Sequence, residues 1–112
     1  MEKLEKFKKI ILEVMQEYAD YFKVVDSDLK YEFITDTSNH HYQLIRLGWH
    51  NRKRVHLLIF HIDIIDGKIW IQQDNTEQGV ANLLVEKGIS KTEIVLAYFS
   101  PSHRKYTDFA AA

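Results

Sequence analysis

The stretch 55–74 contains two apolar segments joined by Asp66-Gly67, and it constrains the fold more than any other part of the chain. Asp-Gly suits a two-residue type I′ turn, because both central residues of that turn need a positive φ. A turn there makes Ile65 the partner of Lys68 and sets the register of the hairpin. The pattern therefore predicts two antiparallel strands, over 55–65 and 68–74.

The two faces of this hairpin differ in chemistry. The aliphatic face should pair Ile64 with Ile69, Ile62 with Ile71 and Phe60 with Gln73, and the other face should pair Asp63 with Trp70 and His61 with Gln72. The polar face therefore gathers four residues that could form a site: His61, Asp63, Trp70 and Gln72.

His61 and Asp63 lie two residues apart in a strand, so their side chains point to the same face. They could be a general base with its orienting carboxylate, or two metal ligands, helped by His41 or Tyr42 from a neighbouring strand. They could also hydrogen-bond with each other as a structural patch. We favour the structural interpretation, because buried polar groups are normally paired. No third ligand follows at a fixed spacing, so we expect neither a metal nor a cofactor.

The rest of the chain predicts further elements. Apolar residues at three- and four-residue steps predict an amphipathic helix over roughly 2–22. Asp26-Ser27-Asp28 indicates a turn, and alternation predicts strands over 29–35 and 41–49. After Asp74 the period changes, which predicts a second helix over roughly 76–87 and a short last strand over 94–99. Two capping boxes are expected, one behind Asp74 or Asn75 and one at Ser90–Glu93.

These elements predict an α+β fold in a single domain, 1–112. It should contain an antiparallel β meander of about five strands, with the N-terminal amphipathic helix and the second helix near the C-terminus packed on it. Because the strand 55–65 is apolar on both faces, we expect cover on both of its sides.

Charge and composition limit the function classes. Lys and Arg total 15 against 16 Asp and Glu, a net charge of −1, which disfavours nucleic-acid binding by the domain as a whole. Local basic clusters at Arg52-Lys53-Arg54 and Arg104-Lys105 could still contact phosphates or a protein partner, although charged hairpin tips are common for solubility alone. There is no Cys, no apolar run long enough for a membrane span and no signal peptide, so we expect a cytoplasmic protein without a membrane role.

Several segments together resemble one family. They are His41-Tyr42-Gln43-Leu44, Gly48-Trp49, His61-Ile62-Asp63-Ile64, Asp66 to Gln72, Thr76-Glu77, Ala81 with Leu84-Val85, and Arg104 to Ala110. This set resembles the XisI family of fdxN element excision controlling factors, found mainly in cyanobacteria. The tail departs from the family pattern, because Ser102 stands where a second proline beside Pro101 is expected.

The resemblance implies a regulatory protein and not an enzyme. Family members are similar to factors that act with a XisH protein, so that a site-specific recombinase can excise a DNA element during heterocyst differentiation. It implies no catalytic residues. Three hypotheses follow. The first is a non-catalytic accessory protein that contacts a XisH-like partner, could also contact the recombinase, and could form a homo-oligomer. The second is a DNA-binding module that uses the basic hairpin tip, and the third is a small-ligand or metal site at His61 and Asp63.

Overall fold

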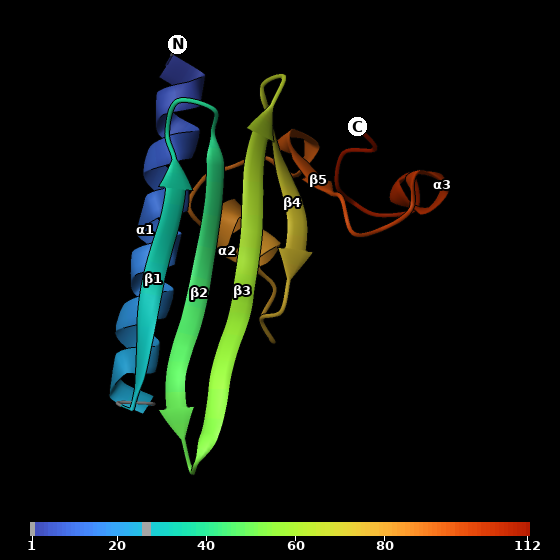
Figure 1. The fold of residues 1–112 in the computed structure, drawn as a ribbon. Helices are drawn as coiled ribbons and strands as arrows, with labels where there is room; N and C mark the ends of the chain where they lie inside the picture. Colours follow the sequence, from blue (N-terminus) through green and yellow to red (C-terminus); the bar gives the residue numbers. More distant parts are fainter. Residues whose placement is uncertain (1, 26–27) are drawn as a thin grey trace.

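The computed structural model describes residues 2–25 and 28–112. Residues 26 and 27 of the predicted turn lie outside these ranges. The sheet has five strands in the order β1-β2-β3-β4-β5 (Figure 1). The elements along the chain are α1 (Glu2–Val25), β1 (Leu29–Asp36), β2 (His41–His50), β3 (Lys53–Ile65), β4 (Lys68–Asp74), α2 (Val80–Glu86), η1 (Lys91–Glu93), β5 (Ile94–Leu96) and α3 (Pro101–Arg104). The α+β prediction is confirmed.

The β3–β4 hairpin turns at Asp66 and Gly67, as predicted. Their φ values are 49° and 77°, the positive pair that a type I′ turn requires. Ile65 pairs with Lys68, and the register holds as far as Ile62, after which it shifts. His61 then pairs with Gln73 and not with Gln72, and Phe60 pairs with Asp74 and not with Gln73. Gln72 is therefore the extra residue of a β-bulge.

The fifth strand corrects the predicted antiparallel meander. Strands β1 to β4 are antiparallel, but β5 pairs parallel to β4, with Ile69 beside Ile94 and Ile71 beside Leu96. A parallel neighbour needs a crossover connection, and α2 with η1 forms it. The sheet is therefore mixed.

The second helix begins later than its periodicity predicts. It starts at Val80, and its N-cap residue is Gly79, with φ 86°. Glycine has no side chain that could cap the first turn. Asp74 takes that role from a distance: its carboxylate accepts the N–H groups of Thr76 and Val80, both at 2.9 Å. The predicted box at Ser90–Glu93 is confirmed.

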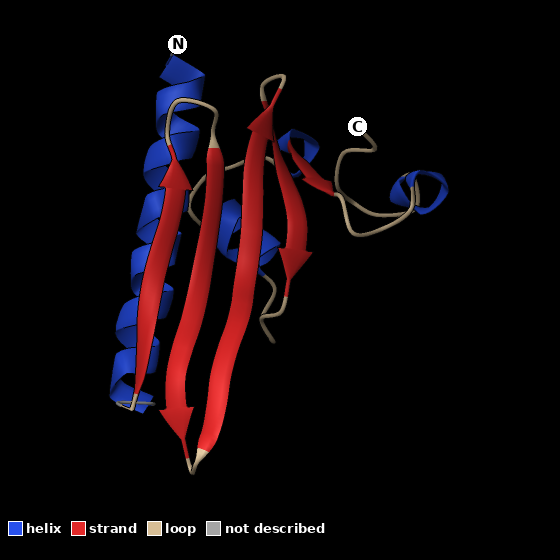
Figure 2. Ribbon diagram, viewed as in Figure 1, coloured by secondary structure: helices blue, strands red, loops and turns tan. Residues whose placement is uncertain are grey.

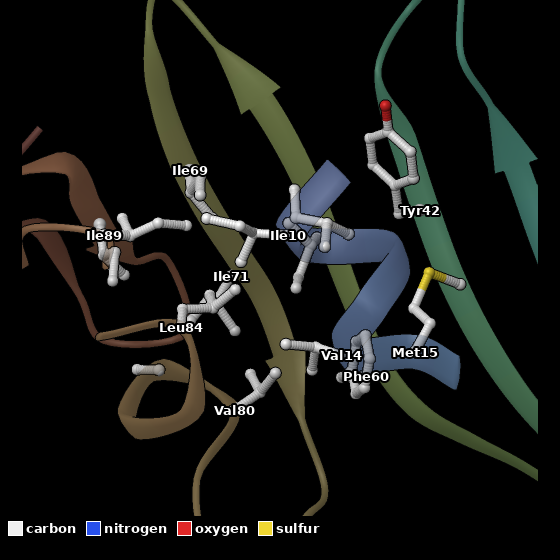
Figure 3. Close-up of a cluster of buried hydrophobic side chains, with 14 of the residues drawn as sticks. Ile10, Val14, Met15, Tyr42, Phe60, Ile69, Ile71, Val80, Leu84 and Ile89 are labelled. Atoms are coloured by element: carbon white, nitrogen blue, oxygen red, sulfur yellow. The ribbon is translucent and has the colours of Figure 1, made fainter. Parts of the chain in front are cut away.

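Helices α1 and α2 lie on one face of the sheet, behind it in Figures 1 and 2. Within the described ranges, neither α1 nor α2 packs on the opposite face, where the tail with Arg104 of α3 contacts Trp70 of β4. The helical cover expected on both sides of β3 is therefore present on one side. The core lies between the helices and the covered face (Figure 3), and its fully buried members include Phe7, Ile11, Met15, Tyr42, Phe60, Ile62, Ile71 and Leu84.

The C-terminal tail closes the sheet edge at β5. Val95 forms a parallel bridge with Ala110, and the Ala110 N–H donates to the Ile94 carbonyl at 2.8 Å. None of the described helices is long and apolar enough to cross a membrane.

Candidate functional site

Asp63 is the centre of a polar cluster on the open face of the sheet. It lies on β3 directly across from His41 on β2 and Trp70 on β4. Its Oδ1 accepts hydrogen bonds from His41 Nδ1 at 2.8 Å and from His61 Nε2 at 2.9 Å, and its Oδ2 accepts from Gln72 Nε2 at 3.1 Å. The structure therefore brings together the predicted residues His61, Asp63 and Gln72.

Each strand contributes to this geometry in a definable way. Side chains two apart in β3 share a face, which places His61 beside Asp63. The β-bulge at Gln72 allows its amide to reach across to the carboxylate of the neighbouring strand. The sequence allows either His41 or Tyr42 to contribute from the neighbouring strand. Only His41 contributes, because Tyr42 faces the opposite way into the core.

The burial of the cluster is uneven. The Asp63 side chain is 11% exposed, that of His61 25% and that of His41 53%. Since a carboxylate only accepts, each neutral imidazole donates the proton on its contacting nitrogen and keeps its other nitrogen as an acceptor. The arrangement satisfies a buried carboxylate and holds two imidazole rings in a defined tautomer.

Metal ligation has no further geometric support. Among the described side chains, no group of three or more His, Asp or Glu residues is arranged to hold a metal ion. The directions of the hydrogen bonds explain this, since both His side chains are turned toward the same Asp63 oxygen.

Trp70 and Arg104 form a second contact beside the cluster. The Arg104 guanidinium lies over the Trp70 ring, 5.3 Å from its centroid, and donates to the carbonyls of Phe99 and Ala97 at 3.0 and 3.1 Å. The tail is thereby docked on β4. Through Nε and Nη2, Arg104 therefore bonds the chain's own backbone, and its predicted contact with nucleic acid or a partner stays a prediction. Lys105 lies over the Tyr106 ring at 5.2 Å.

The other basic cluster lies at the tip of a projecting hairpin. Strand β4 pairs only with residues 60–65 of β3, so β2 and β3 continue beyond it as an arm (Figure 1). Strand β1 pairs with β2 along this arm as far as Gly48, and only the tip of the β2–β3 hairpin extends past β1. The arm turns at Asn51 and Arg52, both with positive φ. Arg52, Lys53 and Arg54 are all exposed there, and the Arg54 guanidinium lies 5.8 Å from the centroid of the Trp49 ring.

A groove on the helix side was not anticipated from the sequence. It holds about 480 Å³ between α1, the arm and the connection before α2. Its lining includes Tyr18, Phe22, Arg46, Leu57 and Leu83. Its parts come from four elements far apart in the chain, so no local motif marks it.

The fold and its surfaces define a class: a small α+β domain whose helices cover one side of a mixed five-stranded sheet and leave a polar cluster on the other. The XisI protein family matches residues 1–111. The chain belongs to the XisI family.

Solved structures agree with this assignment. A XisI-like protein from Anabaena variabilis ATCC 29413 is 37% identical with a TM-score of 0.87, covering 97% of this chain and 99% of that one. The fdxN element excision controlling factor XisI from the same organism is 32% identical with a TM-score of 0.81, covering 98% and 99%. No curated protein matches the chain.

Proposed function

We propose that this protein is a non-catalytic accessory factor that helps to control the excision of a DNA element by a site-specific recombinase, together with a XisH-like partner. The observation that carries the proposal is the match to the XisI family over residues 1–111, with 32% identity to a solved protein named as an excision controlling factor. Heterocyst differentiation in cyanobacteria is the setting in which we expect the role.

We further propose that the partner binds the open face of the sheet. The other face is already filled by α1 and α2, whose side chains make the core. The open face offers a defined polar centre at Asp63, and next to it the exposed ring of His41. A partner that supplies a hydrogen-bond donor to the free nitrogen of His41 would be recognised there.

Co-purification with a XisH-like protein tests the proposal. The two chains should elute together, and His41→Ala should weaken the complex about tenfold or more, since losing one interfacial hydrogen bond costs about 1.5 kcal/mol. Tyr21→Ala is the matched control, because Tyr21 is exposed on α1, which covers the other face of the sheet. If the chains elute independently, the partner proposal fails; if His41→Ala binds as tightly as Tyr21→Ala, the open face is the wrong surface.

A direct contact with DNA is the second candidate function, and the basic arm favours it. Three consecutive cations lie at an exposed tip, and three phosphate contacts predict a slope of log affinity against log salt of about −2.7 for duplex DNA. Replacing Arg52, Lys53 and Arg54 by Ala should flatten this slope. Binding that is absent at low salt, or that keeps its slope in the triple variant, would rule out the arm.

A further inference from the structure

The two edges of the sheet differ in whether another segment pairs with them. At the β5 edge, the strand has only three residues and the tail pairs with it through Val95 and Ala110. At the other edge, β1 runs for eight residues and pairs with β2 along its whole length. Within residues 2–25 and 28–112, no segment pairs with the outer side of β1. One edge is closed, and the other is open.

The open edge lacks most of the features that usually prevent edge-to-edge pairing. Natural edge strands are kept short, or carry charged side chains, a proline or a bulge, or are covered. Strand β1 does carry charges, but they are of both signs. Strand β1 is long, its register with β2 has no shift, and its sequence contains no proline. In an antiparallel pair about half of the backbone N–H and C=O groups of an edge strand point outward and await partners.

Two large apolar side chains on this strand are also in water. Phe33 is 40% exposed and Ile34 is 50% exposed, and they lie on opposite faces of the sheet at the same point along β1. Burying only one of the two faces against a partner would leave the other side chain in water. A strand added at the edge itself covers both.

We propose that β1 pairs antiparallel with β1 of a second copy, about a two-fold axis at Phe33. The charges of β1 select this kind of register. An axis at Glu32 would place Glu32 opposite its own copy, and an axis at Ile34 would place it opposite Asp36, so both oppose like charges.

An axis at Phe33 has the opposite effect. It places Lys30 opposite Asp36 of the second copy twice, because a two-fold interface repeats each contact. It also places the two Phe33 rings face to face across the axis. An axis at Tyr31 would pair Lys30 with Glu32, but it would set Phe33 against Leu29, which is already buried. The Phe33 axis is the one that removes the exposed apolar surface. The result is one continuous sheet with both copies of α1 on the same side.

The mass of the protein in solution is the first test, since the chain weighs 13.3 kDa and the proposal requires twice that value. Ile34→Glu should return the protein to the monomer, because an axis at Phe33 places residue 34 opposite Glu32 of the second copy, and the variant would set two like-charged pairs against each other. Tyr106→Glu is the matched control: it adds the same charge at an exposed position on the tail. It should leave the dimer intact.

Disulfide trapping tests the register, since the natural chain has no Cys that could interfere. Residues directly opposite each other in an antiparallel pair have Cβ atoms about 4.5–5.5 Å apart, so Phe33→Cys should form a disulfide-linked dimer under mild oxidation. In Thr35→Cys the two thiols would be offset by four residues, about 13 Å, and should not react.

Each other outcome overturns the proposal. A wild-type chain that stays monomeric at every concentration shows that β1 does not pair with itself, even if a different protein binds there. A dimer that survives Ile34→Glu uses another surface or another register. Cross-linking through Thr35→Cys but not through Phe33→Cys means a different register. None of these results bears on the XisH-like partner, so this proposal and the proposed function can fail separately.

Discussion

Replacing Asp63 by Ala is the most informative single perturbation of the polar cluster. Its carboxylate accepts hydrogen bonds from His41, His61 and Gln72, and the Asp63 side chain is itself only 11% exposed. The Ala variant removes the acceptor and leaves three donors behind. How much this costs depends on which donors water can reach.

The structure sets the expected magnitude. His41 is more than half exposed and recovers its hydrogen bond from water, so its contribution is discounted. His61 and Gln72 are partly buried and lose hydrogen bonds to a charged acceptor, worth about 1.5–3 kcal/mol each before relaxation. Removing the desolvated carboxylate offsets part of that loss. We expect a decrease in the free energy of unfolding of about 2–3 kcal/mol, or about 10 °C in the melting temperature.

Urea unfolding at neutral pH measures this change, and Asp28→Ala is the matched control. Asp28 also contacts a histidine, His50, at 3.3 Å, but both side chains are about half exposed or more. The control should lose no more than about 0.5 kcal/mol. A double-mutant cycle with His61→Ala should give a coupling energy of about 1 kcal/mol or more.

Two results would refute the reasoning. If Asp63→Ala were as mild as Asp28→Ala, the cluster would not stabilise the sheet. If the cycle showed additive effects, the Asp63–His61 hydrogen bond would contribute nothing of its own. A cluster without a structural role would strengthen the case for a ligand at His61 and Asp63.

Three further predictions concern single positions. The Tyr42 hydroxyl is buried and finds no hydrogen-bond partner within the described chain, so Tyr42→Phe should leave the unfolding free energy unchanged or raise it by up to about 1 kcal/mol in urea; a clear loss would reveal a missing partner. Asp74→Ala removes the acceptor of the Val80 N–H and should lower the melting temperature with a loss of about 1–2 kcal/mol, and a wild-type melt would contradict the capping role. Hydrogen bonds from Asn39 lower the pKa of Asp36 below its ordinary value of 3.8, so Asp36 stabilises the fold above that pH and this contribution disappears as pH falls through its folded-state pKa. Asp36→Ala should therefore lose less stability than wild type between about pH 5 and pH 2, and identical acid titrations followed by circular dichroism would count against it.

Much of the fold follows from local patterns. The periodicity of 2–22 predicts the first helix, and Asp66-Gly67 predicts the central hairpin with its turn and the first pairs of its register. The alternation in β3 also places His61 and Asp63 on one face. These features depend on residues that are close in sequence.

Other features of the site depend on long-range packing. The β-bulge at Gln72 shifts the register after Ile62, and no residue type there marks it in advance. A basic residue such as Arg104 suggests a contact with nucleic acid. The sequence does not show that the tail folds back over Trp70, where Arg104 donates to the carbonyls of Ala97 and Phe99. An arginine that holds the tail on the sheet cannot be distinguished by sequence from one that is exposed to solvent.

The sequence by itself indicated the family, predicted the hairpin and placed His61 and Asp63 on one face, because each of these rests on side-chain identity and local spacing. Only the tertiary structure decided that β5 runs parallel to β4, that both helices lie on one face and that the β1 edge stays open. A three-residue apolar strand has the same sequence pattern whether it pairs parallel or antiparallel. The pattern of an amphipathic helix shows that one of its faces is buried, but not which side of the sheet it covers. These features depend on contacts between residues far apart in the sequence, which form only when the core packs.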